Sequence, residues 1–369
     1  MATENPDTAT GSERDDHRIE LVDTDVHPWH VEDEIATYLP EQYKDKGIQV
    51  PGGQWSNPHD GYLGTSRSDI GGSPGEHREL LVEQVFDDLG MDIGILNAGG
   101  VLLLGISPQF DYAHALAKAY NDWLIDKWLD YDDRLFGSLV IAPQLPEKAA
   151  AEIRRVGDHP RIKQVLMSSG SEMPYGRPHY WPIYEAAEEM GLPVGIHPGA
   201  DGRGLSKPPS GAGHPRTFLE YHATQPCNYY GQVNSMVCEG VFVEYPDLQF
   251  VCIEGGFSWV PTLMWRLDKD WKGMRVQAPY LEKLPSKYII ENCYFGTQPT
   301  VEPENPDHLL QAFDMVQAEE TLLFATDYPH WDTDDPHHSM PKLPDDMARA
   351  VYAENAIELY DLPATTAGL

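Results

Sequence analysis

Four short motifs carry side chains that could bind a metal ion, and each motif follows an apolar run. They are Asp25 and His27 in VDTDVH, His197 in PVGIHPG, Glu254 in CIEGGF and Asp327 in FATDYPH. Carboxylate oxygens and imidazole nitrogens are ligands for zinc, manganese and cobalt. Each residue also has an ordinary structural interpretation, as a cap of a turn or helix for Asp327 or as a hydrogen-bonded group at a strand end. Metal chemistry therefore requires a fold that brings the four motifs together.

Short apolar or β-branched runs bounded by turn residues predict eight strands. These are Ile19–Val22, Ile93–Leu96, Phe136–Ile141, Ile162–Leu166, Pro193–His197, Phe250–Ile253, Cys293–Phe295 and Leu322–Ala325. Segments of helical period separate several of them or follow the last, namely Tyr112–Tyr131, Glu147–Val156, Trp181–Met190 and Asp345–Tyr360. Alternation of strand and helix indicates a parallel sheet, and eight strands favour an α/β fold of the closed (β/α)8 TIM-barrel type.

The barrel prediction places the motifs close together, because the C-terminal ends of barrel strands meet at one mouth. Asp25 and His27 are two residues apart, so their side chains project from the same face of an extended strand. No G-x-G-x-x-G motif follows the first strand, which argues against a dinucleotide-binding fold. The sequence therefore predicts that the acidic and imidazole side chains converge at the mouth.

The chain of 369 residues is predicted to form a disordered polar arm, residues 1–18, and a single barrel domain, residues 19–369. Two insertions rich in Gly and Pro, Pro51–His77 and Pro198–Thr224, are expected as long loops at the mouth. Because the second begins directly after His197, we expect it to act as a lid over the site. The alternative is a surface loop without a role in the site.

The net charge of the chain limits the kinds of molecule that the protein is expected to bind. The chain has 59 acidic and 26 basic residues, a net charge of −33 spread along its length. Such a charge argues against nucleic acid as a partner and is typical of halophile proteins, although an ordinary acidic enzyme is the alternative. No apolar run approaches a membrane span, no secretory signal is evident, and the four cysteines have no CxxC spacing. We therefore expect a cytoplasmic protein that acts on a small molecule, without a membrane or nucleic-acid partner.

The motifs together resemble the amidohydrolase-related family of metal-dependent TIM barrels. The resemblance runs from Ile19 to Tyr360 and rests on VDTDVH, GLPVGIHPG, CIEGGFSWVP, YFGTQP and FATDYPHWD, with YNDWL and RLFGS in the interior. It points to the branch that contains aminocarboxymuconate semialdehyde decarboxylase and γ-resorcylate decarboxylase. With the acidic composition, it also suggests a haloarchaeal source.

The resemblance implies metal ligands at Asp25, His27, His197 and Asp327. Two departures matter: Asp25 stands where relatives often have His or Glu, and Glu254 stands where the decarboxylases commonly have a catalytic His. Relatives with two metals often carry a modified lysine at the end of the fourth strand, whereas Lys163 lies near its beginning. The expectation is one divalent ion per chain, zinc first, with manganese or cobalt as alternatives.

Three functions follow from this site. The first is a hydrolase that uses metal-activated water on a small polar or cyclic carboxylated substrate, with Asp327 as ligand and proton carrier and Glu254 as a second acid or base. The second is a nonoxidative decarboxylase, with His222 or His330 reaching the site from loops, although a solvated loop is the simpler expectation for His222. The third is a binding module that has lost its chemistry.

Further expectations concern the surroundings of the site. Trp29 and Trp331 are candidate walls of an apolar pocket, with packing as the alternative. Arg177 and Arg203 are candidate partners for a substrate carboxylate, with surface ion pairs as the alternative. The family resemblance also implies a homodimer.

Overall fold

The computed structural model describes residues 19–29, 32–45, 48–51, 55 and 71–363. The predicted arm, residues 1–18, and most of the insertion Pro51–His77 lie outside the described residues.

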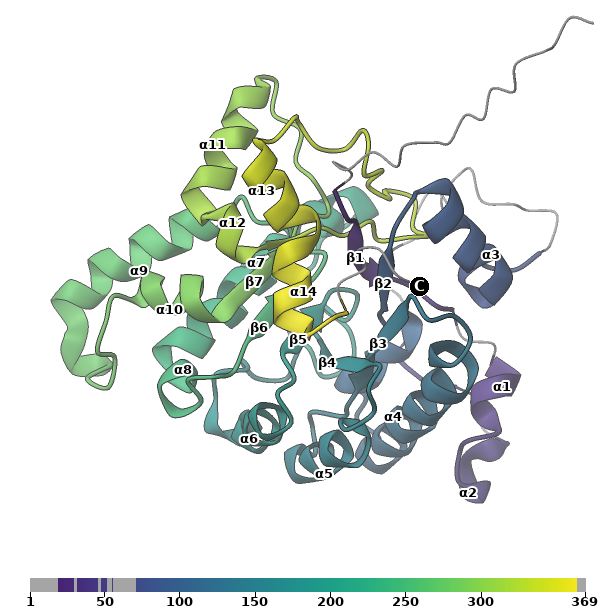
Figure 1. Ribbon diagram of the computed structural model, residues 1–369. Helices are drawn as coiled ribbons and strands as arrows, with labels where there is room; N and C mark the ends of the chain where they lie inside the picture. The colour runs from purple at the N-terminus through teal and green to yellow at the C-terminus, as the bar shows by residue number, and fades with distance from the viewer. Residues whose placement is uncertain (1–18, 30–31, 46–47, 52–54, 56–70, 364–369) are drawn as a thin grey trace, which may run out of the picture.

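Eight parallel strands form the centre of the protein in the order β1 to β8 (Figure 1). They are β1 (Val22–Val26), β2 (Ile93–Leu96), β3 (Leu135–Val140), β4 (Ile162–Ser168), β5 (Val194–His197), β6 (Phe250–Cys252), β7 (Cys293–Gly296) and β8 (Leu322–Leu323). Backbone hydrogen bonds join the chain after β8 to β1, from Thr24 N to Phe324 O (3.1 Å) and from His27 N to Tyr328 O (2.8 Å). These bonds close the sheet, so the predicted (β/α)8 barrel is confirmed.

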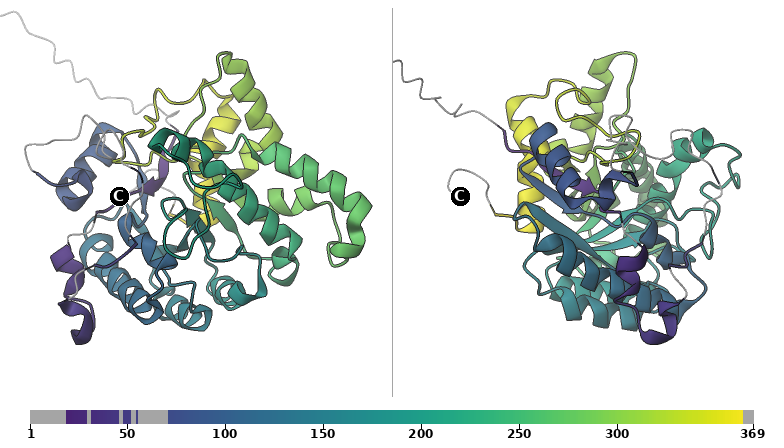
Figure 2. Two further views of the ribbon diagram at one scale, coloured as in Figure 1. Left: turned by 180° about the vertical axis from the view of Figure 1, so that it is seen from behind. Right: turned by 90° about the vertical axis from the view of Figure 1, so that its right-hand side faces the viewer.

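Helices surround the barrel on its outer side (Figures 1 and 2). The α-helices are α1 (Glu32–Ala36), α2 (Glu41–Lys44), α3 (Arg78–Val82), α4 (Phe110–Leu124), α5 (Pro146–Val156), α6 (Trp181–Glu189), α7 (Phe218–Cys238), α8 (Val241–Glu244), α9 (Val260–Met274), α10 (Pro285–Asn292), α11 (Pro306–Val316), α12 (Ala318–Thr321), α13 (Asp345–Arg349) and α14 (Asn355–Tyr360). Short 3₁₀ or π turns are η2 (Pro74–Glu76), η3 (Glu83–Asp88), η4 (Gly100–Ile106), η5 (Ile125–Leu129), η6 (Pro178–Tyr180), η7 (Arg275–Gln277) and η8 (Ala350–Glu354).

Local sequence explains why these segments are helical. In α4 the buried residues Ala113, Leu116, Ala117 and Tyr120 recur with helical spacing, so one stripe packs on the barrel. Helix α5 begins with Pro146, whose fixed φ suits the first helical turn. It ends near Arg154 and Arg155, whose positive charges suit the C-terminal end of the helix dipole.

Two expectations about the elements differ from the structure. The first strand is Val22–Val26 instead of Ile19–Val22, because buried hydrogen bonds hold Asp23 within it: Asp23 Oδ1 accepts from the backbone N–H of Thr326 at 3.0 Å. The expected loop Pro198–Thr224 ends earlier than predicted, because α7 begins at Phe218. Its first turn is capped by Thr217, whose hydroxyl accepts from the N–H of Glu220 at 3.2 Å.

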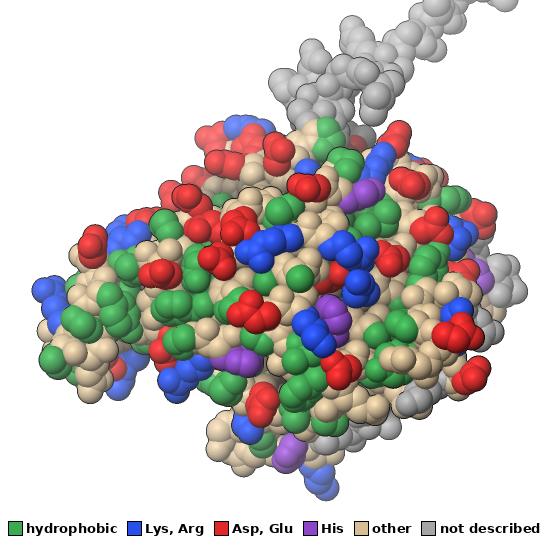
Figure 3. Space-filling view, turned by 90° about the horizontal axis from the view of Figure 1, so that it is seen from below, with side chains coloured by type: hydrophobic (Ala, Val, Ile, Leu, Met, Phe, Trp, Pro, Cys, Tyr) green, Lys and Arg blue, Asp and Glu red, His purple; other side chains and the backbone are tan. Residues whose placement is uncertain are grey.

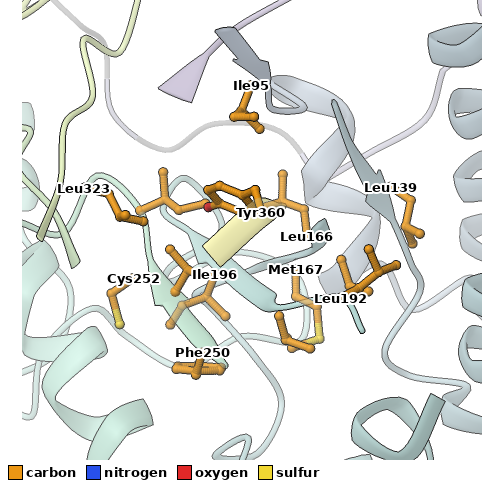
Figure 4. Close-up of a cluster of buried hydrophobic side chains, with 14 of the residues drawn as sticks. Ile95, Leu139, Leu166, Met167, Leu192, Ile196, Phe250, Cys252, Leu323 and Tyr360 are labelled. Atoms are coloured by element: carbon orange, nitrogen blue, oxygen red, sulfur yellow. The ribbon is translucent and has the colours of Figure 1, made fainter. Parts of the chain in front are cut away.

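The C-terminal segment closes the barrel end opposite the mouth. The N–H of Phe324 bonds to Val351 O at 3.0 Å, and Asn355 Nδ2 donates to Leu322 O at 2.8 Å. Helix α14 then places Tyr360 among the apolar side chains of the barrel interior, including Ile95, Leu166 and Leu323 (Figure 4). A segment late in the sequence therefore contributes to the barrel core.

Acidic side chains do not gather in one patch on the face of the molecule seen from below (Figure 3). On the face shown in Figure 3, they are interspersed with Lys and Arg. Within the part of the chain that the structure describes, no helix combines the length and apolar character of a membrane span.

Candidate metal centre

Five buried side chains converge at the mouth of the barrel. Asp25, His27, His197, Glu254 and Asp327 each offer one ligand atom, and these atoms all lie within 4.8 Å of one another. They come from β1, from the end of β5 and from the segments directly after β1, β6 and β8. The structure therefore brings together all the residues predicted from the sequence for metal binding and catalysis.

Strand β1 and its neighbours position Asp25. Its backbone N–H donates to Asp23 Oδ1 at 3.0 Å, and Asp23 Oδ2 accepts from the Thr326 hydroxyl at 2.5 Å. Asn97, directly after β2, donates from Nδ2 to Asp25 Oδ1 at 2.8 Å. Burial raises the pKa of Asp23 to about 7, against the lowering effect of the hydrogen bonds it accepts. The ends of β1, β2 and β8 are thus tied together beside Asp25.

Both ligand-type histidines present the same nitrogen to the centre. His27 Nδ1 lies 3.1 Å from Asn97 O, and His197 Nδ1 lies 3.1 Å from Pro198 O. A carbonyl oxygen can only accept, so each Nδ1 carries the hydrogen and each Nε2 faces the cluster. This arrangement is the one that metal-binding histidines commonly show.

Both carboxylate oxygens of Asp327 contact neighbouring side chains. Its Oδ1 lies 2.9 Å from His27 Nε2 and 2.6 Å from His330 Nδ1, and its Oδ2 accepts from Gln298 Nε2 at 3.4 Å. Asp327 and Glu254 both have positive φ angles, 61° and 54°. This region is uncommon for residues with a Cβ, and such outliers concentrate at functional sites.

Charge is concentrated in this dry environment. Burial raises the pKa of Glu254 well above its ordinary value, and the charges of Asp327 and Asp332 raise it further. Burial lowers the pKa of His27, but the charges and hydrogen bonds of Asp25 and Asp327 together outweigh this and raise it well above the ordinary value. A cluster with this much negative charge attracts a cation, which is either a proton on His27 or a metal ion.

Two buried atoms show that the donor set fits a metal ion. Asp25 Oδ2 and His197 Nε2 make no hydrogen bond, although neither atom reaches solvent. They lie 3.5 Å apart and both belong to the cluster. Buried polar atoms without partners are rare, and an ion between them would satisfy both. The mixed nitrogen and oxygen donors suit zinc, manganese or cobalt.

A cavity of 420 Å³ opens beside the cluster and includes His197, Glu254 and Asp327 in its lining. Its apolar walls contain Trp29, Leu102, Leu103, Phe218 and Trp331. Residues 198–225, which we call the β5–α7 wall, add Arg203, Tyr221, His222 and Gln225. The size and apolar walls of the cavity suit a small ring compound.

The structure also places the peripheral candidates. Trp29, Trp331 and Arg203 line the cavity, whereas Arg177 lies elsewhere and pairs with Glu239 at 2.9 Å. Lys163 donates to Asp361 O at 2.9 Å and is not part of the cluster.

His222 and His330, both expected on loops, lie at the site. His330 contacts Asp327, and His222 lines the cavity with its Nε2 3.2 Å from Asp332 Oδ2. The expectation of a solvated loop for His222 was wrong, because the residue lies on helix α7 and is mostly buried.

Two residues of the centre were not identified from the sequence. Asn97 contacts Asp25 and His27, and Gln298 contacts Asp327. The sequence contained a signal for Asn97, because this residue directly follows the apolar strand Ile93–Leu96. The other site residues likewise lie at or after strand ends.

Comparison with known proteins identifies relatives along most of the chain. A model of the amidohydrolase family matches residues 22–362. A γ-resorcylate decarboxylase from Rhodococcus jostii is 23% identical over 307 residues, which are 79% of this chain and 85% of that protein. Another from Polaromonas sp. is 25% identical over 264 residues, 67% of this chain and 75% of that protein.

Solved structures share the fold. An amidohydrolase from Mycobacterium avium subsp. paratuberculosis superposes with a TM-score of 0.72 at 18% identity, covering 93% of this chain and 99% of its own. A dihydroxybenzoic acid decarboxylase from Polaromonas sp., with bound manganese and the inhibitor 2-nitroresorcinol, superposes with a TM-score of 0.64 at 18% identity. The match covers 93% of this chain and 97% of that one.

Proposed function

The chain belongs to the amidohydrolase family, and from this premise we propose that it is a metal-dependent nonoxidative decarboxylase of a ring carboxylic acid. The observation that carries the proposal is the shared mouth: five donor side chains lie beside a cavity with aromatic walls. The two curated relatives, both γ-resorcylate decarboxylases, favour this reaction over the hydrolysis that we preferred from the sequence.

Asp25, His27, His197 and Asp327 would hold one divalent ion. A bound ion would supply the positive charge that keeps a substrate carboxylate in the site. The sequence favoured zinc, but the manganese in the dihydroxybenzoic acid decarboxylase structure makes manganese the first choice here. The donors suit either ion, since both accept imidazole and carboxylate ligands.

Glu254 is the proposed proton donor. When the bond between the ring carbon and the carboxylate breaks, carbon dioxide leaves and the ring carbon takes a proton. Both oxygens of Asp327 already contact His27, His330 or Gln298, whereas Glu254 lines the cavity with its Oε2 3.1 Å from His197 Nε2. Glu254 is therefore placed to serve as the general acid where the decarboxylases commonly have a histidine.

The substrate binds with its ring between the apolar walls. Trp29, Phe218 and Trp331 exclude water from the ring, and they leave its acidic group facing the cluster. Hydrolysis remains the second candidate because the same donors could bind a lactone or amide carbonyl.

The test is a substrate screen of manganese-loaded protein in molar KCl. Hydroxybenzoic acids, lactones and amides are supplied, and carbon dioxide and hydrolysis products are measured separately. We expect carbon dioxide from a hydroxybenzoic acid, and a loss of at least ~100-fold in Glu254→Gln with its metal retained. Glu239→Gln, which lies away from the cavity, is the matched control. Hydrolysis without carbon dioxide would replace the proposal by the second candidate.

A further inference from the structure

A single file of hydrogen bonds crosses the barrel interior from Asp25 to helix α14. The contacts are Asn97 Nδ2 to Asp25 Oδ1 (2.8 Å), Ser138 Oγ to Asn97 Oδ1 (2.7 Å), Gln164 Nε2 to Ser138 Oγ (3.0 Å) and Tyr360 OH to Gln164 Oε1 (3.0 Å). None of the five side chains is more than 2% exposed. We call this file the interior chain.

The direction of every hydrogen bond in the interior chain is dictated by one backbone carbonyl. Asn97 Nδ2 also faces Thr24 O at 3.0 Å, and a carbonyl can only accept, so Asn97 Oδ1 must accept from the Ser138 hydroxyl. Ser138 Oγ then accepts from Gln164 Nε2. The Gln164 oxygen is left to accept from the Tyr360 hydroxyl. All four donors therefore point toward the Asp25 carboxylate.

The absence of a side chain at Gly195 leaves room for the Gln164 amide. A Cβ at Gly195 on β5 would lie 2.7 Å from Cδ and Oε1 of Gln164, so only glycine lets the amide lie in its place. The Tyr360 hydroxyl enters a region of apolar side chains, including Leu166, Ile196 and Leu323 (Figure 4). A hydroxyl buried there costs free energy unless it is bonded, and phenylalanine would fill the same space without that cost.

The alignment of the donors affects the Asp25 carboxylate at the metal centre. Hydrogen bonds in a buried file polarise one another, so a hydroxyl at one end strengthens the bond at the other. The file ends on Asp25 Oδ1, and it leaves Oδ2 of the same carboxylate without a hydrogen bond and within the cluster. The interior chain thus fixes one oxygen of Asp25 and presents the other.

We propose that the interior chain couples the docking of α14 to metal binding, with Tyr360 as a remote positioning residue for Asp25. This inference rests on the proposed function only in requiring that the cluster bind a divalent ion. Coupling between two sites is reciprocal, so an ion at Asp25 stabilises the docked α14 as much as docking favours the ion.

The first test measures the affinity for Mn²⁺ in the absence of substrate. Tyr360→Phe is expected to weaken binding about three- to tenfold, somewhat less than changes in direct partners of metal ligands. Tyr352→Phe is the matched control, because Tyr352 belongs to the same C-terminal segment but donates outside the interior chain, to Pro336 O at 3.1 Å. Equal affinities for the wild type and both variants would overturn the inference.

The second test covers the case in which Tyr360→Phe does not fold. Amide hydrogen exchange of the wild type is compared with and without Mn²⁺, and exchange in residues 355–360 is expected to slow with the ion more than in α9. In Ser138→Ala, which interrupts the interior chain at its middle, this difference should vanish. Slowing that is the same in Ser138→Ala, or no slowing at all, contradicts the coupling. A wild type that binds no ion contradicts both this inference and the proposed function.

Discussion

The interior chain and the β5–α7 wall are both buried and polar, yet their hydrogen bonding differs. From Tyr360 to Asp25, each donor of the interior chain faces an acceptor. On the wall, the buried Arg203 Nε and the Tyr221 hydroxyl form no hydrogen bond with the described residues. Seven other arginines pair with carboxylates, and Arg203 is the described arginine with a buried nitrogen that has no partner. The seven are Arg134, Arg154, Arg155, Arg161, Arg177, Arg266 and Arg349.

The difference indicates two roles: the interior chain supports the metal centre, and the β5–α7 wall recognises the ligand. Paired buried groups hold a structure in one arrangement, so the interior chain should determine the shape and affinity of the metal centre. Unpaired donors on a cavity wall are costly unless a ligand satisfies them, so the wall should determine which ligand binds. Variants in the first region should alter metal affinity, and variants in the second should alter substrate affinity.

The largest effect is expected at Asn97, where the interior chain reaches the site. Asn97→Leu removes the donor to Asp25, and we expect Mn²⁺ affinity to fall about 10- to 100-fold, as for other partners of metal ligands. Isothermal titration measures the affinity. Asn292→Leu is the control, because Asn292 is also buried and bonded to backbone carbonyls but lies outside the cluster. An equal loss of Mn²⁺ affinity in both variants would show that Asn97 affects metal binding only through the stability of the fold.

A smaller effect is expected from Arg203. Arg203→Gln should raise KM for a carboxylated substrate about tenfold while Mn²⁺ affinity stays unchanged, since the lower end for a charged hydrogen bond, about 1.5 kcal/mol, corresponds to a factor of about ten. Arg216→Gln removes the same charge from an exposed position outside the cavity lining and is the control. An unchanged KM in Arg203→Gln would show that the unpaired guanidinium does not contact substrate.

Gly99 tests the shape of the cavity wall at Trp29. A Cβ there would lie 2.8 Å from Cζ3 of Trp29, so Gly99→Ala should displace the indole into the cavity. Steady-state kinetics should show KM raised by about three- to tenfold with metal content unchanged, because a small misplacement of a wall disturbs substrate alignment. Unchanged KM would indicate that Trp29 does not contact substrate.

The smallest effect concerns Asp201, a buried carboxylate of the same wall that accepts from Ser169 and Asn228. Burial raises its pKa to about 6. The folded state therefore binds more protons than the unfolded state between pH 4 and pH 6, and the free energy of unfolding falls as pH rises through this window. Asp201→Asn should remove a decline of order 1 kcal/mol in denaturant titrations at pH 4, 5, 6 and 7. Parallel pH profiles for wild type and variant would contradict this assignment.

The sequence predicted the barrel and the convergence of its acidic and imidazole motifs because both depend on local patterns. Apolar runs mark the strands, and the strand ends share one mouth. The first strand was misplaced because Asp23 and Thr24 appear too polar for a buried strand, and their partners, Thr326 and Phe324, lie about 300 residues away.

The first part of helix α7, residues 218–224, was mistaken for the end of a loop because it follows a long segment rich in Gly and Pro. A usable signal was present in Thr217 and Glu220, which have the spacing of a capping box. The interior chain had no comparable signal. Its members come from five separate segments, and only the folded barrel aligns their donors.

The halophile character, the cytoplasmic location and the homodimer stay predictions. Activity in molar KCl and in dilute buffer distinguishes a halophile enzyme from an ordinary acidic one, since salt screens the repulsion among its carboxylates.

If the clustered side chains bind one divalent ion, each chain should hold one ion, and this number can be measured. Purified protein is loaded with Mn²⁺ in molar KCl, freed of unbound ion and analysed for manganese per chain, beside a folded His197→Ala variant. We expect about one ion per wild-type chain and a large loss in the variant, because His197 supplies one of the converging donors. A wild type without bound ion, or a variant that retains it fully, would show that these side chains do not form the metal site.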